Sequence, residues 1–428
     1  MQQLILEGGV ALRGRVAVSG AKNAALPLMM ATLLAEGDHQ LDNVPDLADV
    51  STSARLLESL GAAVQYRRGR LEVSTHGLCR CEAPYDLVRT MRASVLCLGP
   101  LVGRFGLARV ALPGGCAIGA RPIDQHLKGL ERMGARVELR HGYVEASARQ
   151  LRGAEIDFDV VTVTGTENLI MAAVLARGTT VLRRAAREPE VVQLAEVLNA
   201  SGARIEGAGG EEIRVEGVAG LAPLRCRVIP DRIEAGTLLL AAAITRGEVI
   251  VEGLVPGHLV AVLDKLREAG VSLEPVEGGM RVRGPERPRA VDLETQPHPG
   301  FPTDMQAQFM ALLCLADGTS SLCEHIFENR YMHALELERL GARIRIEGSR
   351  AIVSGVPRLS GAPVMATDLR ASASLVLAGL AAEGCTAVQR IYHLDRGYQG
   401  LDQKLRGLGA CIRRASPACD DQRTVRAA

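Results

Sequence analysis

The sequence predicts an α/β protein of two inside-out barrel domains, each with three buried helices surrounded by short sheets. Three observations lead to this fold class. The chain has 428 residues, too many for one ordinary core, so two domains of about 200 residues are expected. One helix–strand phrase recurs six times along the chain. In most of the repeats a second helix is apolar on nearly all sides, and such a helix is expected to be buried.

The recurring phrase is a helix that ends at a glycine and is followed by a strand. Residues 57–64 read LESLGAAV, and residues 130–137 read LERMGARV. The glycines of the six copies are Gly61, Gly134, Gly202, Gly270, Gly341 and Gly409, spaced 68 to 73 residues apart. Glycine at this position typically closes a helix in the left-handed conformation. Six copies of one αβ unit therefore predict two domains of three units each.

The second helix of the repeat is more apolar and also ends in a glycine. Its clearest copies cover residues 24–37, 167–178, 233–247, 305–318 and 371–384. The crossover between the domains is expected near residues 228–231, where Pro230 interrupts a strand, so the first domain should end at residue 229. Residues 413–428 show no periodicity and are predicted to form a flexible tail.

Composition and charge exclude several classes of function. The net charge of +1 argues against a nucleic-acid or membrane-surface protein, and aromatic residues make up only 3% of the chain. No secretory signal or membrane-length apolar run is evident. The ten cysteines include no CxxC pair, and the spacing of Cys79 and Cys81 does not suit zinc. A reducing, cytoplasmic setting is therefore expected.

A glycine-rich loop at about residues 112–122, LPGGCAIGARP, carries one cysteine. Its glycines and prolines exclude a helix or a central strand, so Cys116 is expected on an exposed, mobile loop. A thiol there can reach a substrate and can be tuned by a cation such as Arg121. The alternative is a tight turn in which the cysteine is incidental.

Cations stand at the expected starts of several buried helices. These are Lys22, Arg92, Arg232 and Arg370. Because the helix dipole disfavours positive charge at this end, the pattern indicates converging anion sites. The alternative is a solvated charge, or one paired with an adjacent acid, as Arg232 would be with Asp231. His325, Glu328 and His333 do not share a helical face, so no metal site is expected.

With these residues in view, the chain resembles the UDP-N-acetylglucosamine enolpyruvyl transferase family, the 1-carboxyvinyltransferases. The resemblance covers residues 1–412. It rests on the segments at residues 19–25, 113–121, 185–190, 301–308, 327–330, 367–372 and 395–398. It implies that residues 1–21 join residues 230–412 in the second domain, that residues 22–229 form the first, and that the cysteine loop is a lid over a cleft between them.

The resemblance also implies a reaction. The family moves the enolpyruvyl group of phosphoenolpyruvate to the 3-hydroxyl of UDP-N-acetylglucosamine and releases phosphate, the first committed step of peptidoglycan and so cell-wall synthesis. By resemblance, the thiol of Cys116 donates a proton, can form a covalent adduct with phosphoenolpyruvate, and can be alkylated by fosfomycin. Asp304 is the base by the same resemblance. Asp304 could alternatively be a plain helix cap. The implied phosphoenolpyruvate-binding residues are Lys22, Asn23, Arg121, Arg330, Arg370 and Arg396.

The nucleotide sugar is implied to bind residues from both domains. They are Asn23, Arg92, Arg121, Pro122, Ile123, Asp124, Gln125, Val163, Thr164, Gly165, Asp304 and Ile326, and the catalytic set is Lys22, Cys116, Asp304 and Arg396. One segment departs from the family. Many members have Lys-Val-Ser-Val-Gly where residues 161–165 read VTVTG, so the family lysine is missing. Threonine hydroxyls and the Gly165 backbone could still bind phosphate.

Three other functions remain open at this stage. 5-Enolpyruvylshikimate-3-phosphate synthase shares the six-unit fold but lacks the cysteine loop. A non-catalytic paralogue that binds the nucleotide sugar would not need the whole catalytic set. A cysteine hydrolase would need a histidine base, for which His126 is the nearest candidate. The expected partners are the two small-molecule substrates, with no cofactor, metal, nucleic acid or membrane, and the oligomeric state is left open.

Overall fold

The computed structural model describes residues 2–112 and 123–416, which divide into two compact units. The N-terminal unit runs from Ser19 to Ile229, and the C-terminal unit combines the start of the chain, up to Val18, with the segment that begins at Pro230. The first unit thus begins three residues before the predicted residue 22. No helix among the described residues has the length and hydrophobicity needed to span a membrane.

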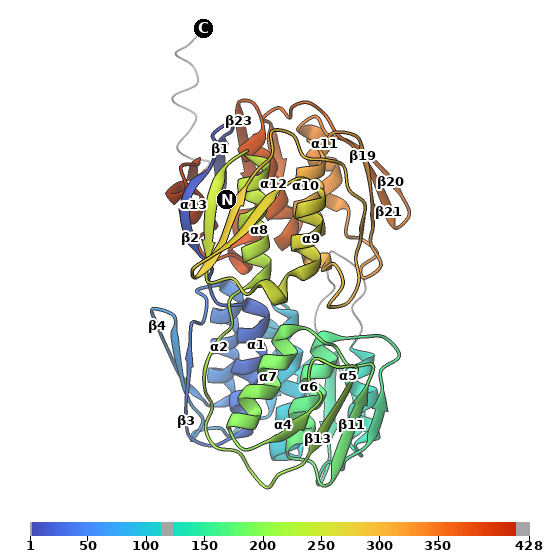
Figure 1. Cartoon of the computed structure of the whole chain (residues 1–428). Coiled ribbons are helices and arrows are strands. Elements are labelled where there is room, and N and C mark those ends of the chain that lie inside the picture. Colours follow the sequence, from blue (N-terminus) through green and yellow to red (C-terminus); the bar gives the residue numbers. More distant parts are fainter. Residues whose placement is uncertain (1, 113–122, 417–428) are drawn as a thin grey trace. The chain divides into compact units, whose positions relative to one another are not determined.

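The described part of the chain forms six four-stranded sheets with one shared topology (Figure 1). In each sheet, a short edge strand pairs in parallel with the next strand, and two further strands follow in antiparallel order. In the N-terminal unit the orders are β14 (Arg225–Arg227), β3 (Asp38–Asp42), β5 (Arg70–Ser74), β4 (Ala63–Arg67); β6 (Glu82–Ala83), β7 (Leu107–Ala111), β9 (Tyr143–Ser147), β8 (Arg136–Arg140); and β10 (Glu155–Asp157), β11 (Thr179–Arg183), β13 (Glu212–Glu216), β12 (Arg204–Glu206).

The sheets of the C-terminal unit repeat this arrangement with strands from both ends of the chain. Their orders are β2 (Arg13–Ala17), β15 (Glu248–Glu252), β17 (Gly279–Arg283), β16 (Ser272–Val276); β18 (Leu293–Glu294), β19 (Thr319–Cys323), β21 (Arg350–Ser354), β20 (Arg343–Glu347); and β22 (Pro363–Met365), β23 (Cys385–Gln389), β1 (Gln3–Glu7), β24 (Cys411–Ala415). β1 and β2 therefore build the start of the chain into this unit, as β14 closes the first sheet of the other.

The glycine repeat corresponds to six helix ends. The helices are α2 (Ala48–Leu60), α5 (Asp124–Arg132), α7 (Pro189–Ala200), α9 (Val260–Glu268), α11 (Met332–Arg339) and α13 (Leu401–Gly407). All six predicted glycines have φ between 90° and 106°, the left-handed region that favours glycine. A strand follows each of them, which confirms the predicted helix–glycine–strand unit.

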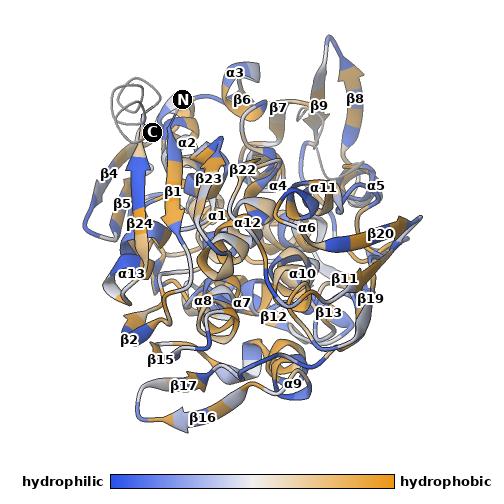
Figure 2. Cartoon of the chain, turned by 90° about the horizontal axis from the view of Figure 1, so that it is seen from above, coloured by the Kyte–Doolittle hydropathy of each residue, from blue (hydrophilic) through white to orange (hydrophobic). Residues whose placement is uncertain are grey.

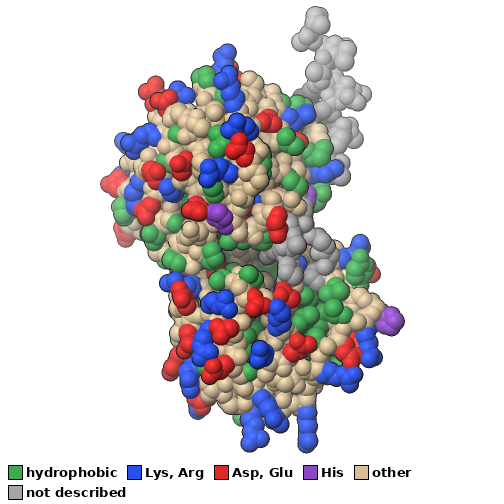
Figure 3. All heavy atoms as spheres, turned by 90° about the vertical axis from the view of Figure 1, so that its right-hand side faces the viewer, with side chains coloured by type: hydrophobic (Ala, Val, Ile, Leu, Met, Phe, Trp, Pro, Cys, Tyr) green, Lys and Arg blue, Asp and Glu red, His purple; other side chains and the backbone are tan. Residues whose placement is uncertain are grey.

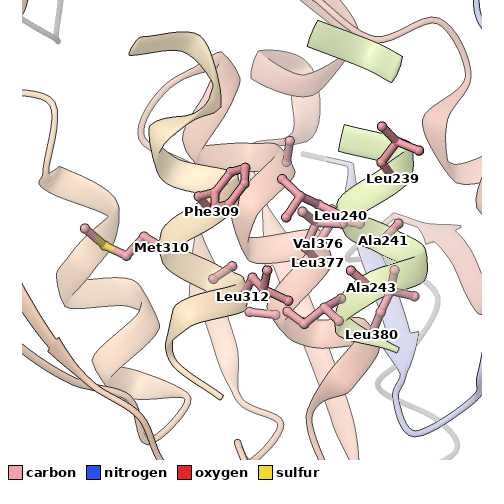
Figure 4. Close-up of a cluster of buried hydrophobic side chains, with 14 of the residues drawn as sticks. Leu239, Leu240, Ala241, Ala243, Phe309, Met310, Leu312, Val376, Leu377 and Leu380 are labelled. Carbon is pink, nitrogen blue, oxygen red and sulfur yellow. The ribbon is translucent and has the colours of Figure 1, made fainter. Parts of the chain in front are cut away.

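The second helix of each repeat lies inside its unit. These interior helices are α1 (Lys22–Ala31, continued by η1, Thr32–Leu34), α4 (Leu98–Phe105, preceded by η2, Arg92–Cys97), α6 (Val163–Val174), α8 (Arg232–Ile244), α10 (Gln306–Leu313, preceded by η4, Thr303–Met305) and α12 (Leu369–Ala381). Figure 4 shows α8, α10 and α12 packed through side chains such as Leu240, Phe309 and Leu377. Each unit has its own hydrophobic core, so the predicted inside-out fold is confirmed.

Hydropathy follows this layering. In Figure 2 hydrophobic residues dominate interior helices such as α10, while strands such as β24 carry many hydrophilic residues. On the face drawn in Figure 3, positive and negative side chains are interspersed, in keeping with the net charge of +1. The remaining short elements are α3 (Tyr85–Val88), η3 (Pro256–His258) and η5 (Ile391–Arg396).

Two features differ from the sequence prediction. The helix predicted to begin at Arg92 is present as η2 followed by α4, but it was not among the apolar helices assigned to the repeat, because Gly99, Pro100 and Gly103 interrupt its apolar pattern. Those glycines let α4 approach α6, since a Cβ on Gly99 would collide with the carbonyl oxygen of Asn168. The tail predicted from residue 413 starts too early, because Arg413, Arg414 and Ala415 belong to β24 and pair with β1. Residues 417–428 lie outside the described part.

Candidate active site

In the C-terminal unit one carboxylate bridges two buried arginines. Oδ1 of Asp304, in η4, accepts a hydrogen bond from Arg330 Nη2 at 3.0 Å, and Oδ2 accepts one from Arg370 Nη2 at 2.8 Å. The arginine side chains are only 3% and 4% exposed, whereas that of Asp304 is 27% exposed. A buried guanidinium needs a nearby anion, because an unpaired buried charge is strongly unfavourable. Two positive charges thus converge on one partly open carboxylate.

The local sequence accounts for the position of Arg370. Asp368 caps α12, and its Oδ1 accepts hydrogen bonds from the backbone N–H groups of Arg370 at 2.8 Å and Ala371 at 3.0 Å. Burial alone would lower the pKa of Arg370, but nearby negative charge, above all that of Asp304, raises it, so the guanidinium is charged. Arg370 Nη1 is buried without a hydrogen-bond acceptor among the described residues. An anionic ligand can use this donor.

A buried hydrogen-bond chain fixes the backbone beside the bridging carboxylate. Gln308 Nε2 donates to the backbone oxygen of Asp304 at 2.9 Å and contacts the Tyr398 hydroxyl at 3.0 Å. That hydroxyl lies 3.0 Å from Thr237 Oγ1, which donates to the backbone oxygen of Ile233 at 2.7 Å. Asp304 is therefore tied to the interior helices α8 and α10. Asp304 itself lies within η4, and the N-cap position of α10 is the next residue, Met305.

Arg396 is the last residue of η5, which packs against α12. The pKa of the neighbouring His393 is lowered by burial and then by the charge of Arg396. The preceding residue, Asp395, accepts hydrogen bonds from Arg414 at 2.7 and 3.0 Å, and Asp402 accepts two more from the same guanidinium at 3.0 and 3.1 Å. The last strand thus holds the turn that carries Arg396.

In the N-terminal unit, Lys22 begins α1 and has an acidic partner. Its Nζ lies 3.6 Å from Oδ2 of Asp49, and the two side chains are 13% and 6% exposed. Since no side chain caps α1, the ammonium adds to the positive end of the helix dipole, and Asp49 offsets both. Asn23 follows on the same turn and is half-buried. The structure therefore places an anionic side chain of the protein, that of Asp49, beside Lys22, where the sequence indicated an anion.

A second chain of hydrogen bonds in this unit runs through a buried histidine. The N–H of Gly99 donates to Asn168 Oδ1 at 2.6 Å, which orients that amide so that Asn168 Nδ2 donates to His126 Nδ1 at 2.8 Å. The other nitrogen, His126 Nε2, then carries the hydrogen and lies 3.3 Å from Thr164 Oγ1. Burial, followed by the charge of Arg92, lowers the pKa of His126 to about 3. The ring is therefore neutral and links Asn168 to Thr164, one of the predicted nucleotide-sugar residues.

The segment that lacks the family lysine begins α6. Val163, Thr164 and Gly165 are its first three residues, and Thr162 is the cap. The hydroxyl of Thr162 accepts the N–H of Gly165 at 3.2 Å. The backbone group that the sequence offered to phosphate is thus already hydrogen-bonded inside the helix.

Ile123 caps α5, which starts with Asp124 and Gln125. The Gln125 amide is engaged by Asp159, because its Nε2 donates to Asp159 Oδ2 at 2.9 Å and its Oε1 accepts the Asp159 N–H at 2.9 Å. Lys128 Nζ lies 2.6 Å from the same carboxylate and 3.4 Å from that of Asp124. In this structure these groups stabilise the start of α5.

Three acidic side chains in α6 and at the start of α7 are buried, although the sequence did not single them out as titrating groups. Glu167 lies in α6, and Glu188 and Glu190 lie at the start of α7. Burial, followed by repulsion from Glu190 and Glu188, raises the pKa of Glu167 well above its ordinary value. Glu167 Oε1 is buried with no hydrogen-bond partner among the described residues. Glu167 therefore favours its neutral form.

Two histidines that were considered as metal ligands, His325 and His333, have a structural partner or are buried. His325 Nε2 lies 2.7 Å from Glu294 Oε1. His333 is fully buried, and burial lowers its pKa to about 4. Within residues 2–112 and 123–416, no three His, Cys, Asp or Glu side chains are grouped so that they could hold a metal ion.

The predicted site residues thus fall into two sets, one in each unit. Asp304, Arg330 and Arg370 are in direct contact, and Arg92 and Thr164 share the neighbourhood of His126. Cys116, Arg121 and Pro122 lie outside the described residues.

Sequence reasoning missed the residues that hold these side chains in place. They include Asp49, His126, Asn168, Thr237, Gln308, Tyr398 and Arg414. For two of them, Gln308 and Tyr398, a signal was present, because both lie inside motifs that carry the family resemblance. The others have no signal in the sequence, since their partners come from distant segments.

Comparisons with known proteins agree on the family. The sequence model of the family described as EPSP synthase (3-phosphoshikimate 1-carboxyvinyltransferase) matches residues 6–405. A UDP-N-acetylglucosamine 1-carboxyvinyltransferase of Anaeromyxobacter sp. (strain Fw109-5) is 61% identical over 419 residues, which cover 97% of this chain and 99% of that protein. The protein of the same name from Myxococcus xanthus is 59% identical, with the same coverage of both chains.

Solved structures of related enzymes share the fold. The crystal structure of the enolpyruvyl transferase NikO from Streptomyces tendae superposes with a TM-score of 0.87 at 28% identity and covers 97% of this chain and 99% of that one. An EPSP synthase from Acinetobacter baumannii reaches a TM-score of 0.75 at 19% identity, with 97% and 100% covered. At that identity the second likeness supports the fold alone.

Proposed function

This chain belongs to the UDP-N-acetylglucosamine 1-carboxyvinyltransferases, within the EPSP synthase family of enolpyruvyl transferases, and we propose from this that it transfers the enolpyruvyl group of phosphoenolpyruvate to the 3-hydroxyl of UDP-N-acetylglucosamine. The reaction releases phosphate and starts peptidoglycan precursor synthesis. Its substrates are small polyanions, and we place it in the cytoplasm, where phosphoenolpyruvate is a metabolite.

The observation that carries the proposal is the Asp304 bridge between Arg330 and Arg370. Phosphoenolpyruvate and the nucleotide sugar together carry about five negative charges, and bringing them together requires cations that are already in place. Arg330 and Arg370 are charged, buried and fixed, and Arg370 has a spare donor. Asp304 is a carboxylate at the same point, available to a hydroxyl proton.

The proposed roles follow from this chemistry. Lys22, Asn23, Arg121, Arg330, Arg370 and Arg396 bind phosphoenolpyruvate. Asn23, Arg92, Arg121, Pro122, Ile123, Asp124, Gln125, Val163, Thr164, Gly165, Asp304 and Ile326 bind the nucleotide sugar. The two sets of residues serve one reaction.

In that reaction Asp304 accepts the proton of the 3-hydroxyl, whose oxygen bonds to C2 of phosphoenolpyruvate while the Cys116 thiol donates a proton to C3. The resulting tetrahedral adduct carries a methyl group and a phosphate ester on one carbon. A proton then leaves the methyl group, the double bond reforms, and the bond between C2 and the phosphate oxygen breaks. Phosphate departs with the electron pair of that bond, so atoms and charge balance.

The test is phosphate release measured with each substrate alone and with both together. The proposal expects release only with both, and a nucleotide product whose mass shows one enolpyruvyl group in place of one hydrogen atom of UDP-N-acetylglucosamine. Shikimate 3-phosphate in place of the nucleotide sugar is the control for the sister activity and should give no release. Release with shikimate 3-phosphate, or none with UDP-N-acetylglucosamine, would refute the proposal.

A further inference from the structure

A buried carboxylate outside the proposed site connects two of its residues. Glu324 follows β19 and is 4% exposed. Its Oε1 accepts hydrogen bonds from the backbone N–H groups of Ile326 at 2.8 Å and Phe327 at 3.1 Å, and from the hydroxyl of Thr295 at 2.9 Å. Its Oε2 accepts the hydroxyl of Thr303 at 2.9 Å. Four donors from three segments thus meet at one side chain.

These donors belong to, or adjoin, the proposed substrate-binding residues. Thr303 immediately precedes Asp304 in the single turn η4. Ile326, proposed to contact the nucleotide sugar, is held through its own N–H. Thr295 extends the connection, because its Oγ1 also accepts the N–H of His325 at 2.9 Å. One carboxylate therefore sets the spacing between the turn of the proposed base and the loop of Ile326.

A carboxylate suits this position better than any other side chain. When ionised it only accepts hydrogen bonds, and its two oxygens have about four acceptor sites, which matches the four donors. Hydrogen bonds to an ionised group are also roughly twice as strong as neutral ones. An amide could keep its oxygen toward Thr295 and the two backbone N–H groups and donate from its NH2 group to the Thr303 hydroxyl, but that hydrogen bond would be reversed and all four would be the weaker, neutral kind.

We infer that Glu324 is a positioning residue for the transfer reaction, one that holds Asp304 through Thr303 and fixes the Ile326 loop directly. The inference rests on the proposed function, because the roles of Asp304 and Ile326 come from it. Glu324 touches neither substrate in this scheme. It acts by keeping the base and the nucleotide-sugar contact at a fixed separation, and misplacement of about 1 Å can cost about a hundredfold in rate.

The experiment removes or changes the hydrogen bonds of Glu324 separately by substitution. Glu324→Ala removes all four hydrogen bonds, Thr303→Val removes the one to η4, and Glu324→Gln leaves only neutral hydrogen bonds, with the one to Thr303 reversed. The matched control is Glu336→Ala, because Glu336 also binds a backbone N–H of another segment, that of Met365 at 2.9 Å, from a partly buried position on α11. Steady-state kinetics are measured for both substrates, together with peptide-level hydrogen exchange.

The kinetic expectation distinguishes positioning from simple stability. Glu324→Ala should lower kcat and raise the KM for UDP-N-acetylglucosamine, each by about tenfold or more. Thr303→Val should lower kcat with little change in that KM, since the Ile326 loop stays bound to the carboxylate. Glu324→Gln should recover part of the loss. Glu336→Ala should leave both constants close to wild type even where it lowers the melting temperature.

Hydrogen exchange gives a readout that does not depend on catalysis. Peptides that cover residues 303–305 and 325–328 should exchange faster in Glu324→Ala, while peptides from the N-terminal unit stay unchanged. A folded Glu324→Ala protein with wild-type kinetics overturns the inference. Should that variant fail to fold, wild-type kcat in Thr303→Val together with wild-type kinetics in Glu324→Gln overturns it instead. Absence of enolpyruvyl transfer in the wild type would refute the proposed function, and full activity of Asp304→Asn would refute the role of Asp304 as base, whereas the exchange data would still show whether Glu324 holds the two segments.

Discussion

Removing the carboxylate of Asp304 should destabilise the C-terminal unit as well as abolish activity. In Asp304→Ala the guanidinium groups of Arg330 and Arg370 lose their hydrogen bonds at 3.0 and 2.8 Å and remain in positions that are 3% and 4% exposed. Breaking a buried ion pair from one side typically costs about 3–5 kcal/mol. The lower end, about 3 kcal/mol, applies here, because Asp304 is partly open to water and screening by solvent weakens its charge interactions.

The assay is scanning calorimetry of the variant and the wild type. For a unit of roughly 200 residues, each kcal/mol lowers the melting temperature by about 2–4 °C, so a fall of about 6–12 °C is expected. Inorganic phosphate should raise the melting temperature of the variant more than that of the wild type, compared with sodium chloride at equal ionic strength, because the vacated arginines bind the anion.

Asp317→Ala is the control for this experiment. Asp317 pairs with Arg287 at 3.3 Å, but its side chain is 76% exposed, and such pairs contribute about 0–1 kcal/mol. Its melting temperature should therefore fall by no more than a few degrees. If Asp304→Ala melted as high as Asp317→Ala, the electrostatic reasoning about the arginine pair would be refuted.

Three further predictions concern other parts of the chain. Burial raises the pKa of Glu167, so the folded protein holds a proton that the unfolded chain releases near pH 4.3, and stability falls as the pH rises from that value toward the higher pKa of the folded state. Glu167→Gln should therefore stabilise the protein increasingly as the pH rises above about 5, and a pH-independent difference in denaturant titrations would contradict this. Cys116→Ser should lose most phosphate release, because a hydroxyl is a far weaker acid than a thiol. Fosfomycin should inactivate the wild type but not the variant. Wild-type rates of phosphate release in the variant would refute the role of Cys116 as proton donor. Arg414→Lys should lower the melting temperature and kcat/KM for phosphoenolpyruvate, because one ammonium cannot replace paired hydrogen bonds to both Asp395 and Asp402. Unchanged kinetics would show that these hydrogen bonds do not position Arg396 for the reaction.

The parts of the fold that could be predicted from the sequence are those in which a single residue type determines the local conformation. Gly61 and its five counterparts were readable because a left-handed helix end favours one residue type. α4 was not recognised as one of the repeated apolar helices, because Gly99 serves close packing against Asn168, a purpose that only the folded chain reveals. The end of β24 was missed for a related reason, since Arg414 looks like part of a polar tail until its distant aspartates are in place.

The same distinction, between what local sequence predicts and what tertiary packing adds, applies to the candidate site. The cations at helix starts could be found because the helix dipole makes them locally unfavourable, which singles out Lys22 and Arg370 from the sequence. Their partners could not be found, since Asp49 lies on the next helix of the same repeat, Asp304 lies in a different repeat from Arg370, and only tertiary packing brings each pair close. His126 showed the reverse pattern: it was unremarkable in the sequence, yet it links Asn168 to a predicted ligand residue.

These pairings bear on how the proposed site for polyanions can exist in the folded protein before substrate arrives. Bare cations at helix N-termini would cost several kcal/mol each when buried, and the fold could not hold both of them unpaired at the stabilities common to proteins. Asp49 and Asp304 remove that cost by supplying one carboxylate to each cation or pair of cations. An incoming phosphate or carboxylate therefore competes with a carboxylate of the protein for the same donors. Net binding energy then depends on the donors that remain spare, such as Arg370 Nη1, and these decide how tightly a first anion is held.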